Sequence, residues 1–245
     1  MTYCIGMLLD EGLVFLADSR TNAGVDQISS FRKVSVYERP GKRVLVMLTA
    51  GNLAITQAVI SLLREHCEIG SEVNMDNVPN MFEAARHVGE QVREVHRRDA
   101  VAMSAQGVEF SASLILGGQI GSEPPSLFCI YSVGNFIEAT ADTPYFQIGE
   151  AKYGKPIIDR VVTRSTSIAQ AAKCALISMD STIRSNLSVG LPLDLVCVRR
   201  DALRVQSHTN IDSDNAYYQM VRKDWSESLR HAFHALPDPD WLRQS

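Results

Sequence analysis

The first fifty residues of the chain show the apolar runs and turns of a series of short strands. Residues 2–9 and 13–17 are almost wholly apolar, and the intervening Asp10-Glu11-Gly12 is typical of a tight turn. Residues 34–37 and 44–50 form two further apolar runs, with Pro40 and Gly41 between them. This pattern predicts four strands before the first helix.

Helical periodicity begins only near residue 52. Residues 52–66 place apolar side chains three and four positions apart behind the N-cap candidate Asn52, and a second run from about Pro79 to Arg98 has the same spacing. Residues 167–180 predict a helix capped by Ser165 or Thr166. A C-terminal helix is predicted from residue 218 to residue 236.

The remaining segments predict strands, and their order indicates the fold class. Residues 112–116 and 127–133 are strand-like on either side of a loop that holds Gly117, Gly118 and Gly121, and residues 193–198 and 203–207 read as a hairpin. Strands and helices therefore come in blocks and do not alternate strictly. Blocks of this kind are typical of an α+β protein with antiparallel sheets and helices packed outside them. No linker interrupts the pattern, so we predict a single domain over residues 1–245.

The composition excludes several classes of protein. With 45% hydrophobic residues and a net charge of −4, the chain lacks the basic balance typical of nucleic-acid binding. No apolar run approaches the roughly 20 residues of a membrane span. The sequence begins without a basic leader, and its five cysteines are scattered, so we expect no signal peptide, reduced thiols and a cytoplasmic protein. The six histidines show no metal-ligand spacing, and we expect them to be solvated or partly buried. We also expect no metal and no cofactor.

The first hairpin brings the start of the chain next to an acid. A turn at residues 10–12 sets a register in which paired residue numbers sum to 21 or 22, so Asp18 lies opposite Tyr3 or Cys4. Directly paired residues lie about 4.5–5.5 Å apart. Asp18 and Thr2 are therefore neighbours in either register.

Thr2 is a candidate nucleophile. A residue as small as threonine at position 2 permits removal of Met1, and we expect the mature chain to begin with Thr2. Its hydroxyl would then lie beside an α-amine with a pKa of about 7.7–8.0, which is suited to act as its base. Each feature taken singly has an ordinary interpretation. Met-Thr is a common start of a chain, an acid such as Asp18 is common at the end of a strand, and a lysine such as Lys33 usually lies on the surface. Their combination favours catalysis.

These residues together resemble a known family. Residues 2–20, which end in LADSR, resemble the N-terminal hairpin of proteasome-type β subunits and of the bacterial HslV peptidase. Residues 31–34 (FRKV) resemble the lysine strand of those proteins, and residues 49–51 (TAG) resemble the turn that supplies their oxyanion hole. Residues 18–24 (DSRTNAG), residues 178–181 (SMDS) and the long C-terminal helix are closer still to the Anbu family, the bacterial "ancestral beta-subunit".

The resemblance implies a fold and a set of catalytic roles. The fold is the αββα four-layer sandwich of the N-terminal-nucleophile hydrolases. Thr2 Oγ would attack the scissile carbonyl, and its α-amine would act as general base and acid. Lys33 would lower the proton affinity of both groups, and Asp18 would orient Lys33. The Gly51 N–H would stabilise the oxyanion. Asp180 matches the later catalytic aspartate of the family.

The resemblance also implies a substrate site. Asn22 matches a position whose backbone aligns the substrate as an added strand. Thr21, Phe31, Thr49 and Leu53 match positions that line the pocket beside the nucleophile. That pocket would be of medium size and largely apolar.

The sequence departs from the family pattern at one important position. Proteasome subunits and HslV carry a serine where this chain has Glu150, between Gly149 and Ala151. Glu150 either turns away from the threonine amine, or changes the pH optimum, or impairs the site. A second family serine follows the later aspartate, and Ser181 and Ser188 both compete for its place.

Three functions remain open on the sequence. The leading hypothesis is a threonine-type peptidase that cleaves peptides or unfolded proteins inside a homo-oligomer, either a ring or an open spiral. The second is a catalytically weak or silent assembly protein, and the third is a non-peptidase amidase of the same superfamily. Residues 212–245 exceed what an HslV-like core needs, so we expect them to form an oligomerisation extension with Trp225 or Trp241 as a buried anchor. An ATPase unfoldase partner is left open.

Overall fold

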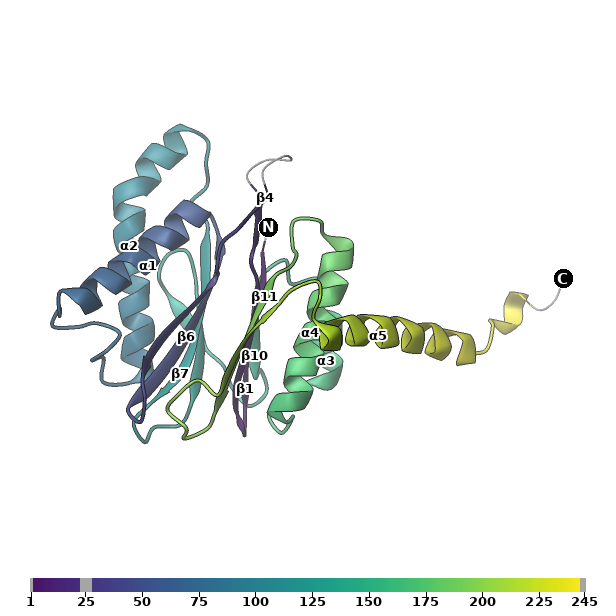
Figure 1. The fold of residues 1–245 in the computed structure, drawn as a ribbon. Coiled ribbons are helices and arrows are strands. Elements are labelled where there is room, and N and C mark those ends of the chain that lie inside the picture. Colours follow the sequence, from purple (N-terminus) through teal and green to yellow (C-terminus); the bar gives the residue numbers. More distant parts are fainter. Residues whose placement is uncertain (1, 23–27, 243–245) are drawn as a thin grey trace.

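The computed structural model describes residues 2–22 and 28–242. Most of its strands form two antiparallel sheets that lie face to face between two layers of helices (Figure 1). The first sheet has the order β10-β1-β2-β11-β12 and the second has the order β5-β6-β7-β8-β9. The first sheet comprises β1 (Tyr3–Leu9), β2 (Gly12–Asp18), β10 (Tyr145–Gly149), β11 (Leu193–Arg199) and β12 (Ser207–Ile211). The second comprises β5 (Val34–Arg39), β6 (Arg43–Gly51), β7 (Ala112–Ile120), β8 (Ser126–Ile130) and β9 (Phe136–Glu138).

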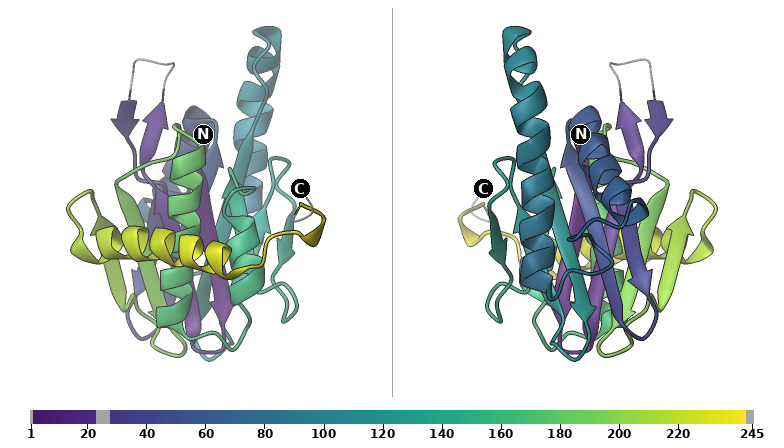
Figure 2. Two further views of the ribbon diagram at one scale, coloured as in Figure 1. Left: turned by 90° about the vertical axis from the view of Figure 1, so that its right-hand side faces the viewer. Right: turned by 90° about the vertical axis from the view of Figure 1, so that its left-hand side faces the viewer.

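The helices complete the sandwich (Figures 1 and 2). Helices α1 (Leu53–Glu68) and α2 (Met81–Ala105) cover the outer face of the second sheet, and α3 (Lys155–Val161) and α4 (Ile168–Ser185) cover the outer face of the first. This order of layers confirms the predicted α+β class and the αββα four-layer sandwich.

The central strands are buried on both faces, which explains their continuous apolar runs. In β1, Cys4 and Leu8 face the second sheet, whereas Tyr3, Ile5 and Met7 face the helices that cover the first sheet. A strand with only one buried face would instead alternate apolar and polar residues. Burial on both sides is thus visible in the sequence as an unbroken run.

The register of the first hairpin follows its turn. Leu9 pairs with Gly12 across a two-residue turn, and Cys4 pairs with Ala17. Paired residue numbers therefore sum to 21, which is one of the two predicted registers and sets Tyr3 opposite Asp18. The backbone N–H of Tyr3 donates to Asp18 Oδ1 at 3.0 Å.

Several predicted boundaries are wrong for local physical reasons. Gly117 and Gly118 belong to β7 and not to a loop. Gly118 allows a close approach to the paired strand β6, because a Cβ at this position would lie 2.2 Å from the Val44 carbonyl oxygen. Helix α2 continues to Ala105, beyond the predicted end at Arg98. Helix α4 is capped by Ser167, which forms a capping box with Gln170, and not by Ser165 or Thr166.

Asn52 does cap α1, since its side chain accepts a hydrogen bond from Ala54 N at 2.9 Å. Some short elements with weak apolar patterns were not predicted from the sequence. These are the hairpin of β3 (Arg20–Asn22) and β4 (Ile28–Ser30), together with β9, β10 and α3. Of these, β3 and β10 contribute to the candidate site.

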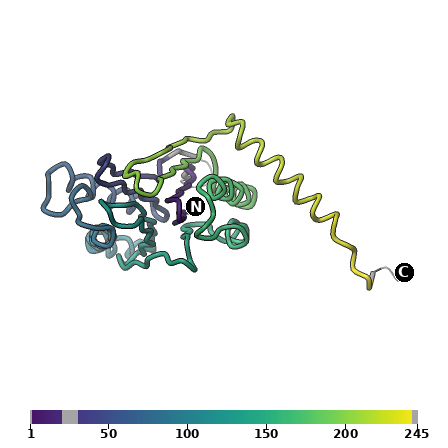
Figure 3. Tube along the Cα trace, turned by 90° about the horizontal axis from the view of Figure 1, so that it is seen from below, coloured from purple at the N-terminus to yellow at the C-terminus, as the bar shows by residue number. Residues whose placement is uncertain are grey.

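Helix α5 (Ala216–Ala235) extends away from the body of the molecule (Figure 3). Only Tyr218 and Val221, near its start, are buried. The chain continues to a short helix, η1 (Asp240–Leu242), in which Trp241 is 81% exposed. Among the described residues, no helix is both long and apolar enough to cross a membrane.

Candidate active site

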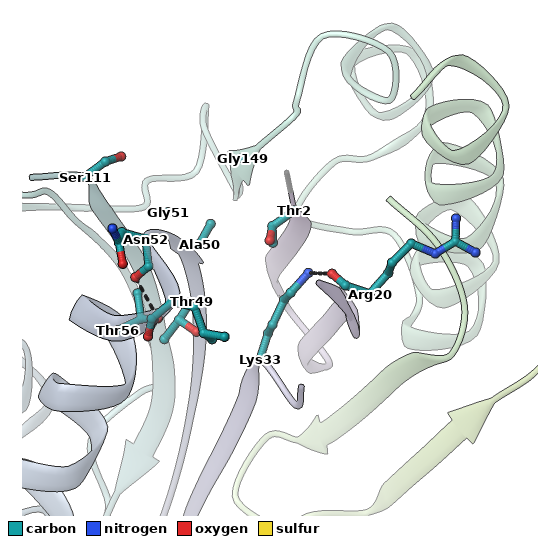
Figure 4. Close-up of a pocket in the computed structure, with 11 residues that line it drawn as sticks. Thr2, Arg20, Lys33, Thr49, Ala50, Gly51, Asn52, Thr56, Ser111 and Gly149 are labelled. Atoms are coloured by element: carbon teal, nitrogen blue, oxygen red, sulfur yellow. Dashed lines mark hydrogen bonds between the residues drawn. The ribbon is translucent and has the colours of Figure 1, made fainter. Parts of the chain in front are cut away.

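A cavity of about 590 Å³ opens at the end of the sheets where β1 begins and β6 ends. Figure 4 shows Thr2 and Lys33 on one wall and Thr49, Ala50 and Asn52 on the facing wall. Its lining consists of Thr2, Arg20, Lys33, Thr49, Ala50, Gly51, Asn52, Leu53, Thr56, Ser111 and Gly149. The structure thus brings together residues of β3, β6, α1 and β10 with Thr2, Lys33 and Ser111, which directly precede β1, β5 and β7.

The most strongly organised feature beside the cavity is a buried ion pair. Lys33 Nζ lies 2.8 Å from Asp18 Oδ1, and the two side chains are 6% and 0% exposed. Lys33 also donates to the Arg20 carbonyl oxygen at 2.7 Å. Backbone N–H groups of Tyr3 and Gly190 donate to Asp18 Oδ1 and Oδ2, at 3.0 and 3.5 Å. Every one of these contacts favours an ionised Asp18 opposite a charged lysine.

Burial acts on Asp18 in the opposite direction. Loss of solvent raises the pKa of the Asp18 carboxyl above its ordinary value, and the charge of Lys33 and its hydrogen bonds only partly oppose that effect. Removing either partner would leave a buried charge without compensation. Desolvation of this ion pair therefore costs stability that only its Coulombic attraction and hydrogen bonds offset, and the pair lies beside Thr2.

Gly51 ends β6 at the cavity wall and has a backbone that a larger residue could not adopt there. Its φ is +113°, and a Cβ at this position would lie 2.4 Å from the Ser111 carbonyl oxygen. Glycine therefore allows the turn from β6 into α1, on the opposite wall from Thr2. This is where the sequence analysis expected an oxyanion-stabilising N–H.

The predicted substrate residues divide into three groups. Thr49 and Leu53 line the cavity as expected. Phe31 does not line it and is 39% exposed. Thr21 and Asn22 form backbone pairs with Ser29 and Ile28 in the β3–β4 hairpin, and their side chains lie outside the described part of the structure.

Glu150 borders Thr2 without lining the cavity. Its backbone N–H donates to the Thr2 carbonyl oxygen at 2.7 Å. Its carboxylate, only 10% exposed, accepts from Asn186 Nδ2 at 3.0 Å and forms an ion pair with Lys152 Nζ at 3.3 Å. Both carboxylate oxygens therefore have partners outside the cavity.

Asp180, which the resemblance placed in the catalytic group, lies apart from the residues that line the cavity. It is buried between α4 and α5, where Arg184 Nε and Arg222 Nε donate to its two oxygens at 2.8 and 2.7 Å. With both oxygens bound by arginines, Asp180 fixes the start of α5 against α4.

The two competing serines also lie outside the cavity lining. Ser181 Oγ donates to the Ile177 carbonyl oxygen within α4 at 3.1 Å. Ser188 contributes its backbone N–H to Asn186 Oδ1 at 2.9 Å. Neither position therefore supplies the family serine to the cavity.

Six of the lining residues and one of their neighbours were not predicted as site residues. The six are Arg20, Ala50, Asn52, Thr56, Ser111 and Gly149, and Asn186 contacts Glu150 beside the cavity. Arg20, Ala50 and Gly149 stand within or beside motifs visible in the sequence, and Asn52 was predicted only as a helix cap. The others depend on contacts between distant elements. Among the described residues, no group of three His, Cys, Asp or Glu side chains is arranged to hold a metal ion.

Comparison with known proteins gives a consistent result. The family described as "Proteasome subunit" matches residues 2–196. The structure of Anbu from Yersinia bercovieri is 53% identical, with a TM-score of 0.92, and the match covers 97% of this chain and 99% of that one. This chain belongs to the Anbu family of proteasome-type proteins.

Two further Anbu structures support the same assignment. Anbu from Hyphomicrobium sp. strain MC1 is 49% identical with a TM-score of 0.88, over 97% of this chain and 99% of that one. A structure described as the helical assembly of the Anbu complex from Pseudomonas aeruginosa is 48% identical with a TM-score of 0.92, over 97% of this chain and 98% of that one. No curated protein sequence is similar enough to count as a match.

Proposed function

We propose that this Anbu-family protein is a threonine-type peptidase in which Thr2, exposed by removal of Met1, is the nucleophile. The observation that carries the proposal is the buried Asp18–Lys33 pair beside Thr2 at an open cavity. An ion pair buried to this degree is costly as a purely structural device. Met1 itself lies outside the described residues.

The proposed reaction begins with proton transfer from Thr2 Oγ to the α-amine of the same residue. Oγ then attacks the scissile carbonyl carbon, and the Gly51 N–H stabilises the resulting oxyanion. The α-amine passes its proton to the leaving amine, and an ester remains on Thr2. A water molecule, deprotonated by the α-amine, attacks this ester, and collapse of the second tetrahedral intermediate releases the acid and returns the proton to Oγ.

Lys33 and Asp18 support this chemistry by their charges. A lysine ammonium next to the nucleophile favours the deprotonated forms of the hydroxyl and the amine. Asp18 fixes Lys33, and the Arg20 carbonyl oxygen accepts a second of its protons. The backbone of β3, which includes Asn22, would align an extended substrate across the cavity, with Thr49 and Leu53 contacting its side chain.

The test compares two variants with peptide substrates. Thr2→Ala should abolish hydrolysis while leaving the ion pair and the folded structure intact. Lys33→Ala should lower kcat/KM by about 10²–10⁴-fold, because the proton transfers lose their neighbouring cation. Thr209→Ala, which changes an exposed threonine on β12, is the matched control and should retain full activity.

The measurement combines peptide-library hydrolysis with mass spectrometry of the N-terminus. A mature chain beginning at Thr2 and loss of hydrolysis in both variants would support the proposal. Retained turnover in Lys33→Ala, or hydrolysis by a protein that keeps Met1, would contradict it. Absence of hydrolysis by the mature protein would favour a silent assembly protein, and cleavage of small amides alone would favour the amidase.

We also propose that the chain forms a homo-oligomer, as a ring or an open spiral, with α5 as an interface element. The relative from P. aeruginosa is described as a helical assembly. In this chain α5 leaves the body carrying exposed apolar side chains at Leu229, Phe233 and Leu236, which are 50%, 71% and 70% exposed. Contiguous exposed apolar side chains of this kind indicate a contact surface.

A further inference from the structure

A loop that follows α4 connects both sides of the candidate site. Residues 186–190 contact it at three points. Asn186 Nδ2 donates to Glu150, the Leu187 carbonyl oxygen accepts from Arg20 at 3.1 Å, and Gly190 N donates to Asp18 Oδ2. Gly190 lies so close to Arg20 that a Cβ would be 2.2 Å from the guanidinium carbon. One short segment therefore contacts the neighbours of both Thr2 and Lys33.

The orientation of the Asn186 amide follows from its partners. Its Oδ1 accepts from the Ser188 backbone N–H at 2.9 Å, so its Nδ2 is the atom that faces Glu150 Oε2 at 3.0 Å. An amide in this orientation must donate to the carboxylate. Asn186 thus fixes one of the two oxygens of Glu150, and the exposed Lys152 holds the other.

Glu150 is close enough to Thr2 for its position to matter. Gly149 and Thr2 approach so closely that a Cβ at Gly149 would lie 1.9 Å from the Thr2 carbonyl oxygen, and Glu150 N binds that same oxygen. A glutamate side chain is long enough to span one residue and reach the Thr2 amine. In the structure it does not enter the cavity, although Thr2 and Gly149 both line it.

We infer that Asn186 is a positioning residue that holds the Glu150 carboxylate away from the Thr2 α-amine, so that the amine stays neutral and able to accept a proton near pH 7. This inference rests on the proposed function. A carboxylate released toward the amine would stabilise its ammonium form and raise its pKa. The other charged groups around the amine are Lys33, Asp18 and Arg20, and those around the carboxylate include Lys152. None of them replaces the donor that Asn186 supplies to Oε2.

The sharpest variant is Asn186→Asp, because it retains an acceptor for Ser188 N, removes the Nδ2 donor to Glu150 and places a like charge against that carboxylate. It should raise the pKa of the Thr2 amine by about one unit and move the acid limb of the kcat/KM profile upward by the same amount. The double variant Glu150→Gln/Asn186→Asp exchanges the amide and the carboxylate, restores one donor and one acceptor, and should return the pKa toward its original value. Asn210→Ala removes a similar amide–carboxylate contact, to Asp194 Oδ1, and is the matched control. It should change neither the pKa of the Thr2 amine nor the acid limb of the kcat/KM profile.

The amine pKa is measured without reference to turnover. The protein is released from a cleavable N-terminal fusion so that it begins at Thr2, and trace labelling of its amine with acetic anhydride is followed against pH by mass spectrometry. The expected shift and its reversal support the inference even if no variant hydrolyses a peptide, a result that would count against the proposed function alone. An unchanged amine pKa in Asn186→Asp, or a shift that the exchanged pair does not reverse, would overturn the inference.

Discussion

At the scale of single residues, the site depends on close approaches that leave no space for a side chain. Gly149 has a φ of +80° and lies against the Thr2 carbonyl oxygen. Gly51, on the opposite wall, has a φ of +113° and lies against the Ser111 carbonyl oxygen. The proposed nucleophile Thr2 and the expected oxyanion donor Gly51 therefore each depend on a glycine whose Cα lies against the backbone of another segment.

Gly149→Ala should displace Thr2 and abolish hydrolysis. The new Cβ would lie 1.9 Å from the Thr2 carbonyl oxygen, a distance that only a backbone shift can relieve. Gly121→Ala is the matched control, because Gly121 also has a positive φ, +56°, but has open space around its Cβ. Both variants carry backbone strain of roughly 1–2 kcal/mol.

Peptide hydrolysis and urea unfolding separate the two effects. The unfolding free energy of Gly121→Ala should decrease only by the amount of that strain, and the variant should retain its activity. Equal activity in the two variants would show that the position of Thr2 is not set by its contact with Gly149.

At the scale of secondary structure, the interface of α1 and α2 contains an unusual pair of histidines. His87 of α2 is buried, at 4% exposure, and its ring lies 5.4 Å from that of His66 on α1. His87 Nε2 and His66 Nδ1 are buried, and neither has a hydrogen-bond partner among the residues that the structure describes. The expectation that all six histidines would be solvated or partly buried is therefore wrong for His87, which packs inside the helical layer.

Burial, and secondarily the neighbouring His66, lower the pKa of His87. The pKa of an unfolded histidine is about 6.5. Above this pH, a histidine whose pKa is lower in the folded state makes its full contribution to stability. That contribution is lost as pH falls from the unfolded pKa through the lower folded pKa, because only the unfolded chain then binds the proton. We therefore expect the unfolding free energy to decrease between pH 7 and pH 5, and the decrease to be smaller in His87→Gln.

Urea unfolding at several pH values tests this expectation. His234→Gln, on the exposed face of α5, is the matched control and should leave the pH dependence unchanged. A His87→Gln variant with the same pH dependence as the parent protein would show that the pKa of His87 is the same in the folded and unfolded states.

At the scale of the whole molecule, the chain divides into a packed sandwich and a projecting C-terminal segment. The start of α5 belongs to the sandwich, because Tyr218 and Val221 are buried and Arg222 binds Asp180. Beyond that point the apolar side chains are exposed, and Trp225 borders a cavity together with Ile157 and Ile177. A deletion that begins near the middle of α5 should therefore affect the proposed assembly without removing buried contacts of the sandwich.

Deletion of residues 229–245 should reduce the size of the oligomer without unfolding the chain. It removes Leu229, Phe233, Leu236 and Trp241 and keeps Tyr218 and Val221. Light scattering at micromolar concentration measures the size, and near-ultraviolet circular dichroism is the control for folding. An unchanged size would exclude this segment as an interface element, and a full-length protein that is monomeric at about 27 kDa would contradict the proposed assembly.

Local patterns in the sequence were enough to predict the part of the site that depends on strand pairing. The turn at Asp10 and Glu11 leaves two registers for β1 and β2, both with Asp18 near Thr2, and the structure has the one that sets Tyr3 opposite Asp18. The unbroken apolar runs and the Asn52 cap also follow from local patterns, since strand period, turn length and capping act over a few residues. Together with the motif that contains Lys33, these features were enough to predict the family and the layered fold.

The distant partners of the buried acids follow from the packing of separate elements. Asp180 stands in a recognisable motif and pairs with Arg184 one helical turn away, but its second partner is Arg222, a residue 42 positions further along the chain. Glu150 turns to Asn186, 36 positions away, and Gly190 reaches Asp18 across the sheet. A carboxylate in the interior takes the donors that packing brings to it, and because those donors come from loops and helices distant in sequence, no local pattern specifies which ones they are.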